Sequence, residues 1–586
     1  MADADPTLTT ARETMGTLPR RDFLAGTAAT VAGVMTSAGL GSANGSTGTP
    51  SSTEPGGPDA PDDQPAGQMI RRPNIILFIT DQERAPMHWP AGWADENLPN
   101  RRRLVDNGLS FENAFCSTAM CSPSRSTFFT GKFPAEHGVT ATLTEGGTLS
   151  AGEATLSTSE QNMARILGSA GYRVHYRGKW HISKGADGGS PTPEDIAEYG
   201  FLGWEGPDFG GDTAVKNFGG GCADNDGHVT DQAVEFLSTV EQSEDQPFAL
   251  IISLANPHDI LSFPKTWDEQ DGDCGNYGPA APGAFLQGIE LPATYTERLA
   301  LNHKPSAQVQ SQLLIAGALG PLPTERGARD YANFYAYLHT IVDQHLGTVL
   351  DTLDARPEVR DRTVIFRISD HGEMGMSHGG LRQKAFNAYE ETLRVPLIVS
   401  NPVMFPAPVT TPALASLVDL MPTMAGLAEI PDPDAFTFRG ASLVPVIEQA
   451  VTSPSAPVAD VQDTVMFTFD DENAAAADGQ DIVKRPNHIR AVRDHRYKYA
   501  VYFDPAGVAP PQAELYDLHV DPHELSNLAN PSAPLQFRPD LVATMHGKLV
   551  EKMAATHTTP DVPIPVPEPL PSGSLGAGSL GSVAMS

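Results

Sequence analysis

The stretch Asn74-Ile75-Ile76-Leu77-Phe78-Ile79-Thr80, which leads into Asp81-Gln82, decides the fold class of this chain. It is a continuous run of apolar residues without polar alternation, which is typical of a strand buried on both faces in a parallel sheet. Four further runs of this kind predict strands at 172–176, 248–254, 363–368 and 396–399. Helical patterns lie between them, for example at 229–240 and 328–353. This alternation predicts an α/β fold with a large, mostly parallel sheet flanked by helices.

The pattern changes after residue 455. Residues 488–493 and 497–503 are predicted to form antiparallel strands joined by a turn at Asp494-His495, and a final helix is predicted at 539–553. We therefore predict a smaller C-terminal α+β domain that contains an antiparallel sheet. The predicted divisions are a catalytic domain at 71–455, this C-terminal subdomain at 456–558 and a flexible tail, rich in Pro, Gly and Ser, at 559–586.

The N-terminal part predicts export. Arg20-Arg21-Asp22-Phe23-Leu24 precedes a weakly apolar stretch from Ala25 to Gly41, which is typical of a twin-arginine (Tat) signal. We assign residues 1–45 to this signal and residues 46–70 to a disordered linker. A Tat signal implies the Tat export machinery as a partner and a periplasmic, cell-surface or secreted location. The alternative is a chance arginine pair in an unstructured tail, and the sequence defines no cleavage site.

The bulk composition limits the classes of partner. A formal net charge of −33 argues against nucleic acid, because phosphate binding needs a basic face. It also disfavours a long polyanion lying across the general surface, whereas a small anion in a locally basic pocket is compatible with it. Four cysteines in 586 residues do not make a disulfide scaffold. Cys116 is expected to serve packing, and the sequence leaves open whether Cys222 and Cys274 pair.

Titratable and metal-binding residues follow the ends of four predicted strands. In an open α/β sheet the ligand site lies outside the carboxyl ends of the strands, so these residues are expected at one edge. A structural explanation exists for each residue alone, such as a helix cap or a solvated lysine, but the coincidence of four strand ends favours a site. These residues are Asp81 and Gln82, Lys179 and His181, His258, and Asp370 and His371.

A second signal is the spacing in Cys121-Ser122-Pro123-Ser124-Arg125, followed by Thr130-Gly131. Pro123 suits the first turn of a helix, where its missing N–H costs nothing. Cys121 would then lie at a helix N-terminus, where backbone N–H groups and the helix dipole favour an anion. Arg125 would add a cation about one turn further on. The alternative is a buried structural cysteine.

These motifs together resemble the sulfatase family of the alkaline-phosphatase-like superfamily. The run from Cys121 to Gly131 is similar to the sulfatase signature, and the similarity extends over roughly residues 73–530. The other elements that resemble the family are Pro73-Asn74-Ile75-Ile76-Leu77 with Asp81, Gly178-Lys179-Trp180-His181, Asn256-Pro257-His258, Ser369-Asp370-His371-Gly372, Lys384, and Glu514-Leu515-Tyr516-Asp517-Leu518 with Asp521-Pro522 and Asn527-Leu528.

The resemblance implies that a formylglycine-generating enzyme oxidises Cys121 to formylglycine, whose hydrate is the nucleophile in sulfate ester hydrolysis. It also implies a bound divalent metal, Ca²⁺ with Mg²⁺ or another divalent cation as alternatives. The implied metal ligands are Asp81, Gln82, residue 121, Asp370 and His371. Gln82 and His371 depart from the aspartate and asparagine of many members, and imidazole is an unusual ligand for Ca²⁺, so the identity of the metal stays open.

The resemblance further implies catalytic roles for seven residues. Residue 121 attacks sulfur while Asp370 takes its proton. Arg125, Lys179 and Lys384 offset negative charge on the hydrate and the sulfate. His258, with Lys384, protonates the departing alkoxide. His181 takes the proton of the remaining hydroxyl as sulfate is expelled.

Two other functions fit the same motifs. One is hydrolysis of a phosphonate monoester or phosphate diester on the same scaffold, and the other is binding of a sulfate ester without modification of Cys121 or turnover. The substrate is expected to be a small-molecule or saccharide sulfate ester. Its alcohol portion should be selected by the stretches 206–228 and 264–327, whose side chains do not indicate a particular substrate. The sequence does not decide exo or endo action or the oligomeric state.

Overall fold

A computed structural model describes residues 66–85, 87–144, 153–243, 245–278, 283–477 and 480–568. The predicted signal at 1–45 and most of the predicted linker and tail lie outside these residues. The domain boundaries given above therefore stay predictions. In the described part of the chain, no helix combines the length and the apolar character that a membrane span requires.

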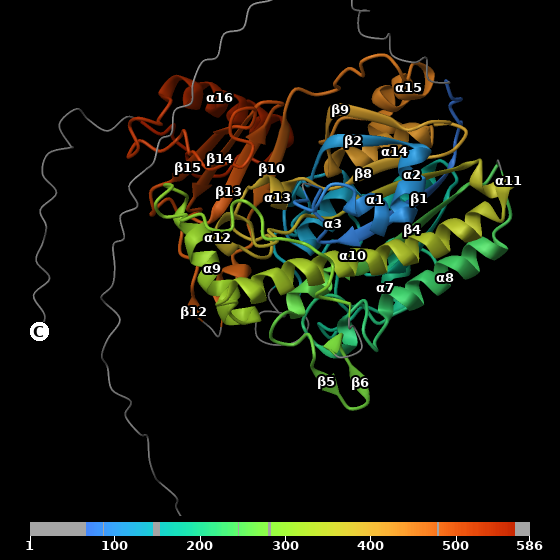
Figure 1. Cartoon of the computed structure of the whole chain (residues 1–586). Coiled ribbons are helices and arrows are strands. Elements are labelled where there is room, and N and C mark those ends of the chain that lie inside the picture. The colour runs from blue at the N-terminus through green and yellow to red at the C-terminus, as the bar shows by residue number, and fades with distance from the viewer. Residues whose placement is uncertain are drawn as a thin grey trace, which may run out of the picture. The chain divides into compact units, whose positions relative to one another are not determined.

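A seven-stranded sheet forms the centre of the larger part of the molecule (Figure 1), in the order β3-β4-β1-β7-β8-β2-β9. Every strand runs parallel to its neighbours except β8, which is antiparallel to both β7 and β2. The strands are β3 (Arg173–Gly178), β4 (Phe248–Pro257), β1 (Asn74–Asp81), β7 (Thr363–Ser369), β8 (Leu397–Ser400), β2 (Gly108–Phe115) and β9 (Val409–Ser416). The predicted large, mostly parallel sheet is confirmed.

The central strand β1 shows why the sequence run is apolar throughout. All eight of its residues are buried. Ile75, Leu77 and Ile79 face one core, and Ile76 and Phe78 face another on the opposite side of the sheet. A strand covered on both faces has no solvated side, so polar alternation is absent.

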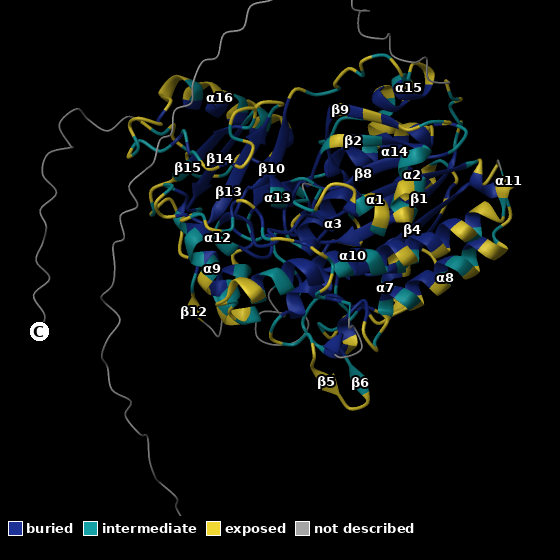
Figure 2. Ribbon diagram, in the orientation of Figure 1, coloured by how far each residue is buried: buried dark blue, intermediate teal, exposed yellow. Residues whose placement is uncertain are grey.

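Helices cover both faces of this sheet. On the face of Ile76 and Phe78 lie the long helices α8 (Asn225–Thr239) and α10 (Glu325–Asp354), which run side by side in Figure 1. Figure 2 shows exposed positions along the ribbons of both helices, whereas the strands of the sheet are mostly buried. The other face carries the buried helix α3 (Cys121–Thr130) together with α6 (Met163–Ser169) and α14 (Leu420–Leu427).

The sequence did not predict β2 and β9. Unlike β1, both strands alternate over part of their length, with exposed residues such as Glu112 in β2 and Thr410 in β9. They lie at the end of the sheet, where one face is only partly covered, so they lack the continuous apolar run that identified the central strands. Polar and small residues within them weakened the pattern further.

The C-terminal part forms a four-stranded antiparallel sheet, as predicted. Its strand order is β10-β13-β14-β15, and helix α16 (Pro539–Thr556) packs on one face through Val542, Met545 and Leu549. The strands are β10 (Val465–Phe469), β13 (His488–Arg493), β14 (Tyr497–Phe503) and β15 (Gln512–Asp517). A single bridge between Thr118 and Thr468 brings β10 next to the segment that precedes α3.

The cysteines settle one question that the sequence left open. Cys222 and Cys274 form a disulfide with a Cα–Cα distance of 5.3 Å. It ties the segment before α8 to the small hairpin of β5 (Gln270–Asp271) and β6 (Cys274–Gly275), which projects from the molecule in Figure 1. Cys116 and Cys121 are free and buried, and Cys116 lies in the main hydrophobic core.

Candidate active site

The carboxyl ends of four neighbouring parallel strands carry the predicted polar residues to one edge of the sheet. Asp81 is the last residue of β1, and Lys179 directly follows β3. His258 begins the 3₁₀ helix η2 (His258–Ser262) that follows β4, and Asp370 follows β7. The structure therefore brings together residues that are separated by nearly 300 positions in the chain.

Cys121 is the first residue of helix α3, and Pro123 lies in its first turn. Every residue of this helix is buried. Gly131 ends the helix in a left-handed conformation (φ 73°), which favours glycine, and its N–H donates to the Thr127 carbonyl at 2.9 Å. The sequence motif thus sets both ends of a short helix whose N-terminus faces the edge of the sheet.

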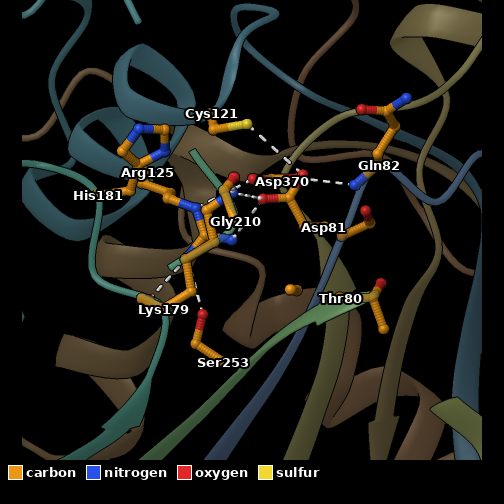
Figure 3. A network of polar contacts seen from close by, with 12 residues as sticks. Thr80, Asp81, Gln82, Cys121, Arg125, Lys179, His181, Gly210, Ser253 and Asp370 are labelled. Atoms are coloured by element: carbon orange, nitrogen blue, oxygen red, sulfur yellow. Dashed lines mark hydrogen bonds and ion pairs between the residues drawn. The ribbon is translucent and has the colours of Figure 1, made fainter. Parts of the chain in front are cut away.

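Arg125 binds the two aspartates together (Figure 3). Its Nη2 lies 3.1 Å from Asp81 Oδ2 and its Nε 3.1 Å from Asp370 Oδ2. Its Nη1 donates to the Lys179 carbonyl at 3.1 Å and to Ser253 Oγ at 2.8 Å. Burial opposes the charge, but Asp370 and Asp81 outweigh it and raise the pKa of the guanidinium. Arg125 is fully buried, so its contacts indicate that it holds the carboxylates in place.

Two lysines carry positive charge to the same centre. Lys179 Nζ lies 2.5 Å from Asp81 Oδ2 and 2.5 Å from the Gly210 carbonyl. Burial lowers the pKa of Lys179, but Asp81 and Cys121 reverse this effect and raise it. Lys384 Nζ donates to Gln82 Oε1 at 2.6 Å. Burial opposes a thiolate at Cys121, yet Lys179 and Lys384 hold its pKa well below the usual range.

Four potential metal ligands face one another in this centre. One ligand atom each from Asp81, Cys121, Asp370 and His371 lies within 4.8 Å of the others. Cys121 Sγ is 3.5 Å from Asp81 Oδ1 and 3.3 Å from His371 Nε2, and this Nε2 is 3.7 Å from Oδ1 of each aspartate. Both aspartates give Oδ2 to Arg125 and keep Oδ1 toward the shared space.

Gln82, also a predicted ligand, is engaged differently. Its backbone N–H donates to Asp370 Oδ1 at 3.1 Å, but its amide points away from the group in Figure 3. The amide nitrogen donates to Glu373 Oε2, and the amide oxygen accepts from Lys384. A ligand role for Gln82 stays a prediction that would require the amide to exchange these partners.

The two predicted proton-transfer histidines lie at the opening of the centre. His181 Nε2 is 2.7 Å from the Leu143 carbonyl, and its backbone N–H donates to Asp208. Burial lowers the pKa of His258 to about 4. Asp81 opposes this effect, and the charges of Lys179 and Lys384 add to it. Nδ1 of each ring is buried without a hydrogen-bond partner among the described residues.

A cavity of about 290 Å³ opens onto these groups. Cys121, His181, His258 and Lys384 line its inner end. Both stretches that were expected to select the substrate contribute to the wall: 206–228 through Gly211, Asp212 and Thr213, and 264–327 through helix α9 (Ser306–Leu319). Ala474 and Ala476 come from the C-terminal subdomain, which the sequence did not connect with the site.

Sequence reasoning also missed the buried carboxylates that support the site. Asp208 accepts the backbone N–H groups of Trp180 at 2.8 Å and His181 at 2.7 Å. Asp226 accepts those of Ala255 and Asn256 at 2.6 and 3.0 Å, at the end of β4. These aspartates lie in or next to a Gly-rich stretch, and no local spacing identifies their distant partners.

Comparisons with known proteins agree with this geometry. A family model described as sulfatase matches residues 73–430, and one described as the C-terminal part of N-sulphoglucosamine sulphohydrolase matches residues 378–554. The choline-sulfatase of Rhizobium meliloti is 28% identical over 492 residues, which cover 79% of this chain and 84% of the relative. The N-acetylglucosamine-6-O-sulfatase of Bacteroides thetaiotaomicron is 25% identical over 504 residues, with the same two coverages.

Solved structures share the fold. One protein in complex with its substrate D-glucosamine-2-N,6-O-disulfate gives a TM-score of 0.60 at 22% identity, over 83% of this chain and 98% of its own. The phosphonate monoester hydrolase of Silicibacter pomeroyi gives a TM-score of 0.56 at 22% identity, over 83% and 96%. At these identities the likeness extends to the fold alone.

Proposed function

This chain belongs to the sulfatase family and is a sulfatase, and we propose that it hydrolyses its sulfate ester with a formylglycine made from Cys121. The observation that carries the proposal is the place of Cys121. It begins a buried helix at the inner end of the cavity, with Sγ 3.5 Å from Asp81 Oδ1 and 3.3 Å from His371 Nε2. The cations that favour a thiolate there would equally favour an oxyanion.

Formylglycine at position 121, once hydrated, supplies one hydroxyl for attack on sulfur and a second whose deprotonation expels sulfate, so no second attack at sulfur is needed. Asp370 lies close enough to accept the first proton. His181 lines the cavity beside residue 121 and accepts the second. Lys179 and Lys384 balance negative charge on the sulfuryl oxygens. His258, also on the cavity wall, delivers a proton to the departing alkoxide.

The donor set fits a divalent cation. Two carboxylate oxygens and one imidazole nitrogen face residue 121, and Arg125 keeps the remaining carboxylate oxygens occupied. Asp81, Asp370, His371 and residue 121 would hold the ion. It would lower the pKa of the attacking hydroxyl and neutralise charge on the sulfate. Carboxylates favour Ca²⁺ or Mg²⁺, and the imidazole admits other divalent cations.

Mass spectrometry tests the nucleophile. The peptide that contains Cys121, from protein expressed with a formylglycine-generating enzyme, should carry the aldehyde, and sulfate release from 4-nitrophenyl sulfate should rise with its occupancy. Cys121→Ala should abolish release, and Cys116→Ala, at the other free buried cysteine, should retain it. Full activity in protein that carries only the unmodified thiol would overturn the proposal.

The rival functions are separable in the same preparation. The site residues named above do not separate sulfate from phosphonate esters, so aryl phosphonate and phosphate diesters should be assayed beside the aryl sulfate, and kcat/KM compared. A higher value for the phosphonate would replace the proposed reaction by phosphonate ester hydrolysis. Saturable binding of a sulfate ester with no sulfate release from any substrate would support the binding-protein alternative.

We also propose that the chain is exported in folded form through the Tat machinery. The paired arginines support this, and so does the Cys222–Cys274 disulfide, because disulfides persist in oxidising compartments. Cys121 is buried in the fold, so its oxidation would have to precede folding in the cytoplasm. Arg20→Lys with Arg21→Lys should leave active protein in the cytoplasm, and unchanged export of this variant would contradict the proposal.

A further inference from the structure

The outer wall of the active-site cavity is apolar. The residues that line it beyond the reactive groups are mostly aliphatic, and the described lining contains no Phe, Tyr, Trp or Arg. Lys384, whose Nζ is held by Gln82, is the single lysine of this lining. The aliphatic residues are Leu261, Leu314, Ile315, Ala318, Leu319, Ala385, Ala474 and Ala476.

Helix α9 supplies half of this aliphatic surface. Its 14 residues, SAQVQSQLLIAGAL, include no charged side chain, although the chain as a whole carries a formal charge of −33. Leu313 on the same helix is 69% exposed and does not line the cavity. A helix at the surface ordinarily has a charged face. An uncharged helix beside a cavity instead indicates a surface that meets an apolar ligand.

Few polar groups remain for the alcohol portion. Beyond the reactive residues, Thr142, Asp212, Thr213 and Gln383 are the polar side chains in the described lining. Asp212 Oδ1 already accepts from the Ala214 N–H and from Asn217 Nδ2, each at 2.8 Å. Gln383 Nε2 has no hydrogen-bond partner among the described residues, so it can donate one bond near the ester.

We propose that the alcohol portion of the substrate is uncharged and predominantly apolar, as in a primary alkyl sulfate. This inference rests on the proposed sulfatase reaction and specifies its substrate class. The aliphatic wall would take up the carbon chain, and each buried methylene would raise kcat/KM roughly fourfold. The sulfate end would remain with the cationic residues at the inner end of the cavity.

Other classes of alcohol fit this wall less well. A sugar would bury several hydroxyls against aliphatic side chains, and an unpaired buried hydroxyl costs binding energy. A further sulfate or carboxylate would meet Asp212 and no additional cation. A quaternary ammonium group would find no Phe, Tyr or Trp ring among the described lining residues, although Asp212 offers one carboxylate.

The test compares sulfate release by aldehyde-containing enzyme from matched esters. kcat/KM should rise from ethyl through butyl to hexyl sulfate. It should also be higher for 3,3-dimethylbutyl sulfate than for choline sulfate, which has the same shape with a positive charge. N-acetylglucosamine 6-sulfate should be the poorest of the set. A flat alkyl series, or a preference for choline sulfate or the sugar sulfate, would overturn the inference.

A pair of variants on one helix locates the effect. Leu319→Ser, on the cavity wall, should lower kcat/KM for hexyl sulfate roughly tenfold and leave ethyl sulfate nearly unchanged. Leu313→Ser, on the exposed side of α9, should change neither value. Equal losses on both substrates at Leu319 would contradict a role in chain binding, and thermal unfolding would show whether that variant is folded.

The assay also separates this inference from the reaction on which it depends. If enzyme with confirmed aldehyde releases sulfate from none of the esters, including 4-nitrophenyl sulfate, the proposed function fails. If it releases sulfate but favours the sugar or choline ester, the sulfatase reaction stands and the apolar substrate class alone is wrong.

Discussion

Two buried clusters in this molecule contain similar residues but differ in how their charges are arranged. The active-site cluster brings together Asp81, Cys121, Asp370 and His371, and a second cluster brings together His378, Glu391 and Glu524. Both place potential metal ligands within 4.8 Å of one another. Residue type and proximity therefore do not distinguish a reactive centre from a structural one.

The difference lies in which groups engage the carboxylate oxygen atoms. Among the described residues, Asp370 Oδ1 accepts only backbone N–H groups, those of Gln82 and His371. In the active-site cluster Arg125 takes Oδ2 of both aspartates, and both Oδ1 atoms stay directed at the shared space. In the second cluster Lys498 lies 2.5 Å from Glu524 Oε1, and the Glu390 N–H donates to Glu524 Oε2 at 2.9 Å.

The imidazole of His378, in the second cluster, is also paired with carboxylates. His378 Nδ1 lies 2.6 Å from Glu297 Oε2 and its Nε2 3.5 Å from Glu391 Oε2. Burial opposes its charge, but Glu391 and Glu297 raise its pKa to about 9. Both ring nitrogens of His378 thus face carboxylates, whereas His371 turns Nδ1 to the Gly372 carbonyl and leaves Nε2 in the shared space. The second cluster therefore stabilises the contact between the large sheet and the C-terminal subdomain.

Lys498→Met should give the largest effect on stability. It would leave Glu524 without its buried cation and Glu390 with Arg493 as its remaining buried cation, at a cost of about 3–5 kcal/mol. Activity below the lowered melting temperature should be retained, because Lys498 contacts no active-site residue. Lys548→Met, at the partly exposed pair with Asp494, should cost about 1 kcal/mol or less. Chemical denaturation with parallel kcat measurements checks both, and lost activity in folded Lys498→Met would contradict the separation of the clusters.

Lys384→Met should lower activity strongly and leave stability nearly unchanged, the reverse of Lys498→Met. Removing this cation from the inner end of the cavity should lower kcat/KM roughly 100- to 1000-fold, as for other groups that stabilise transition-state charge. Its Nζ donates to two neutral amide oxygens, Gln82 Oε1 at 2.6 Å and Gln383 Oε1 at 3.4 Å, so the free energy of unfolding should change by about 1 kcal/mol. Steady-state kinetics and denaturation on the same sample decide this. A loss of stability equal to that of Lys498→Met would show that the active-site cluster is as important for stability as the second cluster, and would contradict the distinction between them.

A divalent cation should stabilise the protein through the active-site cluster alone. At a free concentration about 100 times its Kd, it should add about 2.7 kcal/mol to the unfolding free energy, and chelation should reverse this effect and remove activity. Asp81→Asn should abolish the stabilisation by weakening one ligand. Glu391→Gln, the matched change in the second cluster, should retain it. Thermal unfolding with and without cation measures both. If Glu391→Gln lost the stabilisation by the cation, the ion would bind in the second cluster instead.

The sequence predicted the parts of the molecule whose signal is local. The strands β13 and β14 have the predicted bounds, and β1 extends one residue beyond the predicted run, to Asp81, because burial on both faces or a short hairpin leaves a pattern within a few residues. The strand ends also placed Asp81, Lys179 and His258 at one edge, because parallel strands share their direction.

The rest depends on contacts between distant segments. Nothing near Asp226 in the sequence indicates that its carboxylate accepts the amides at the end of β4. The partners of the Gln82 amide are Lys384 and Glu373, about 300 residues away, and so its orientation was not predictable. The apolar cavity wall joins α9 to the segment after β10, and these meet only in the folded chain.

A third buried group, formed by Asp259 and Asp226 next to His258, differs from both clusters because no cation among the described residues pairs with its carboxylates. Asp259 Oδ2 accepts from the Tyr277 hydroxyl and from the Gly220 N–H, and its Oδ1 has no partner among the described residues. Burial, with the charge of Asp226 added, raises its pKa to about 7, and burial raises that of Asp226 to about 6. Without a neighbouring cation, these carboxyls are expected to be protonated at mildly acid pH.

Asp259→Asn should therefore flatten the dependence of stability on pH. A carboxyl whose pKa is raised by folding binds more protons in the folded state, so its contribution is complete below pH 4 and is lost as the pH rises toward 7. The wild type should lose at most about 1.4 kcal/mol per pH unit through this group between about pH 5 and pH 7. The asparagine mimics the protonated form and should remove that part of the slope. Denaturation at pH 5, 6 and 7 measures it, and an unchanged slope would mean that Asp259 stays charged despite its burial, as expected for Asp81 beside Arg125 and Glu390 beside Lys498, whose pKa values are lowered.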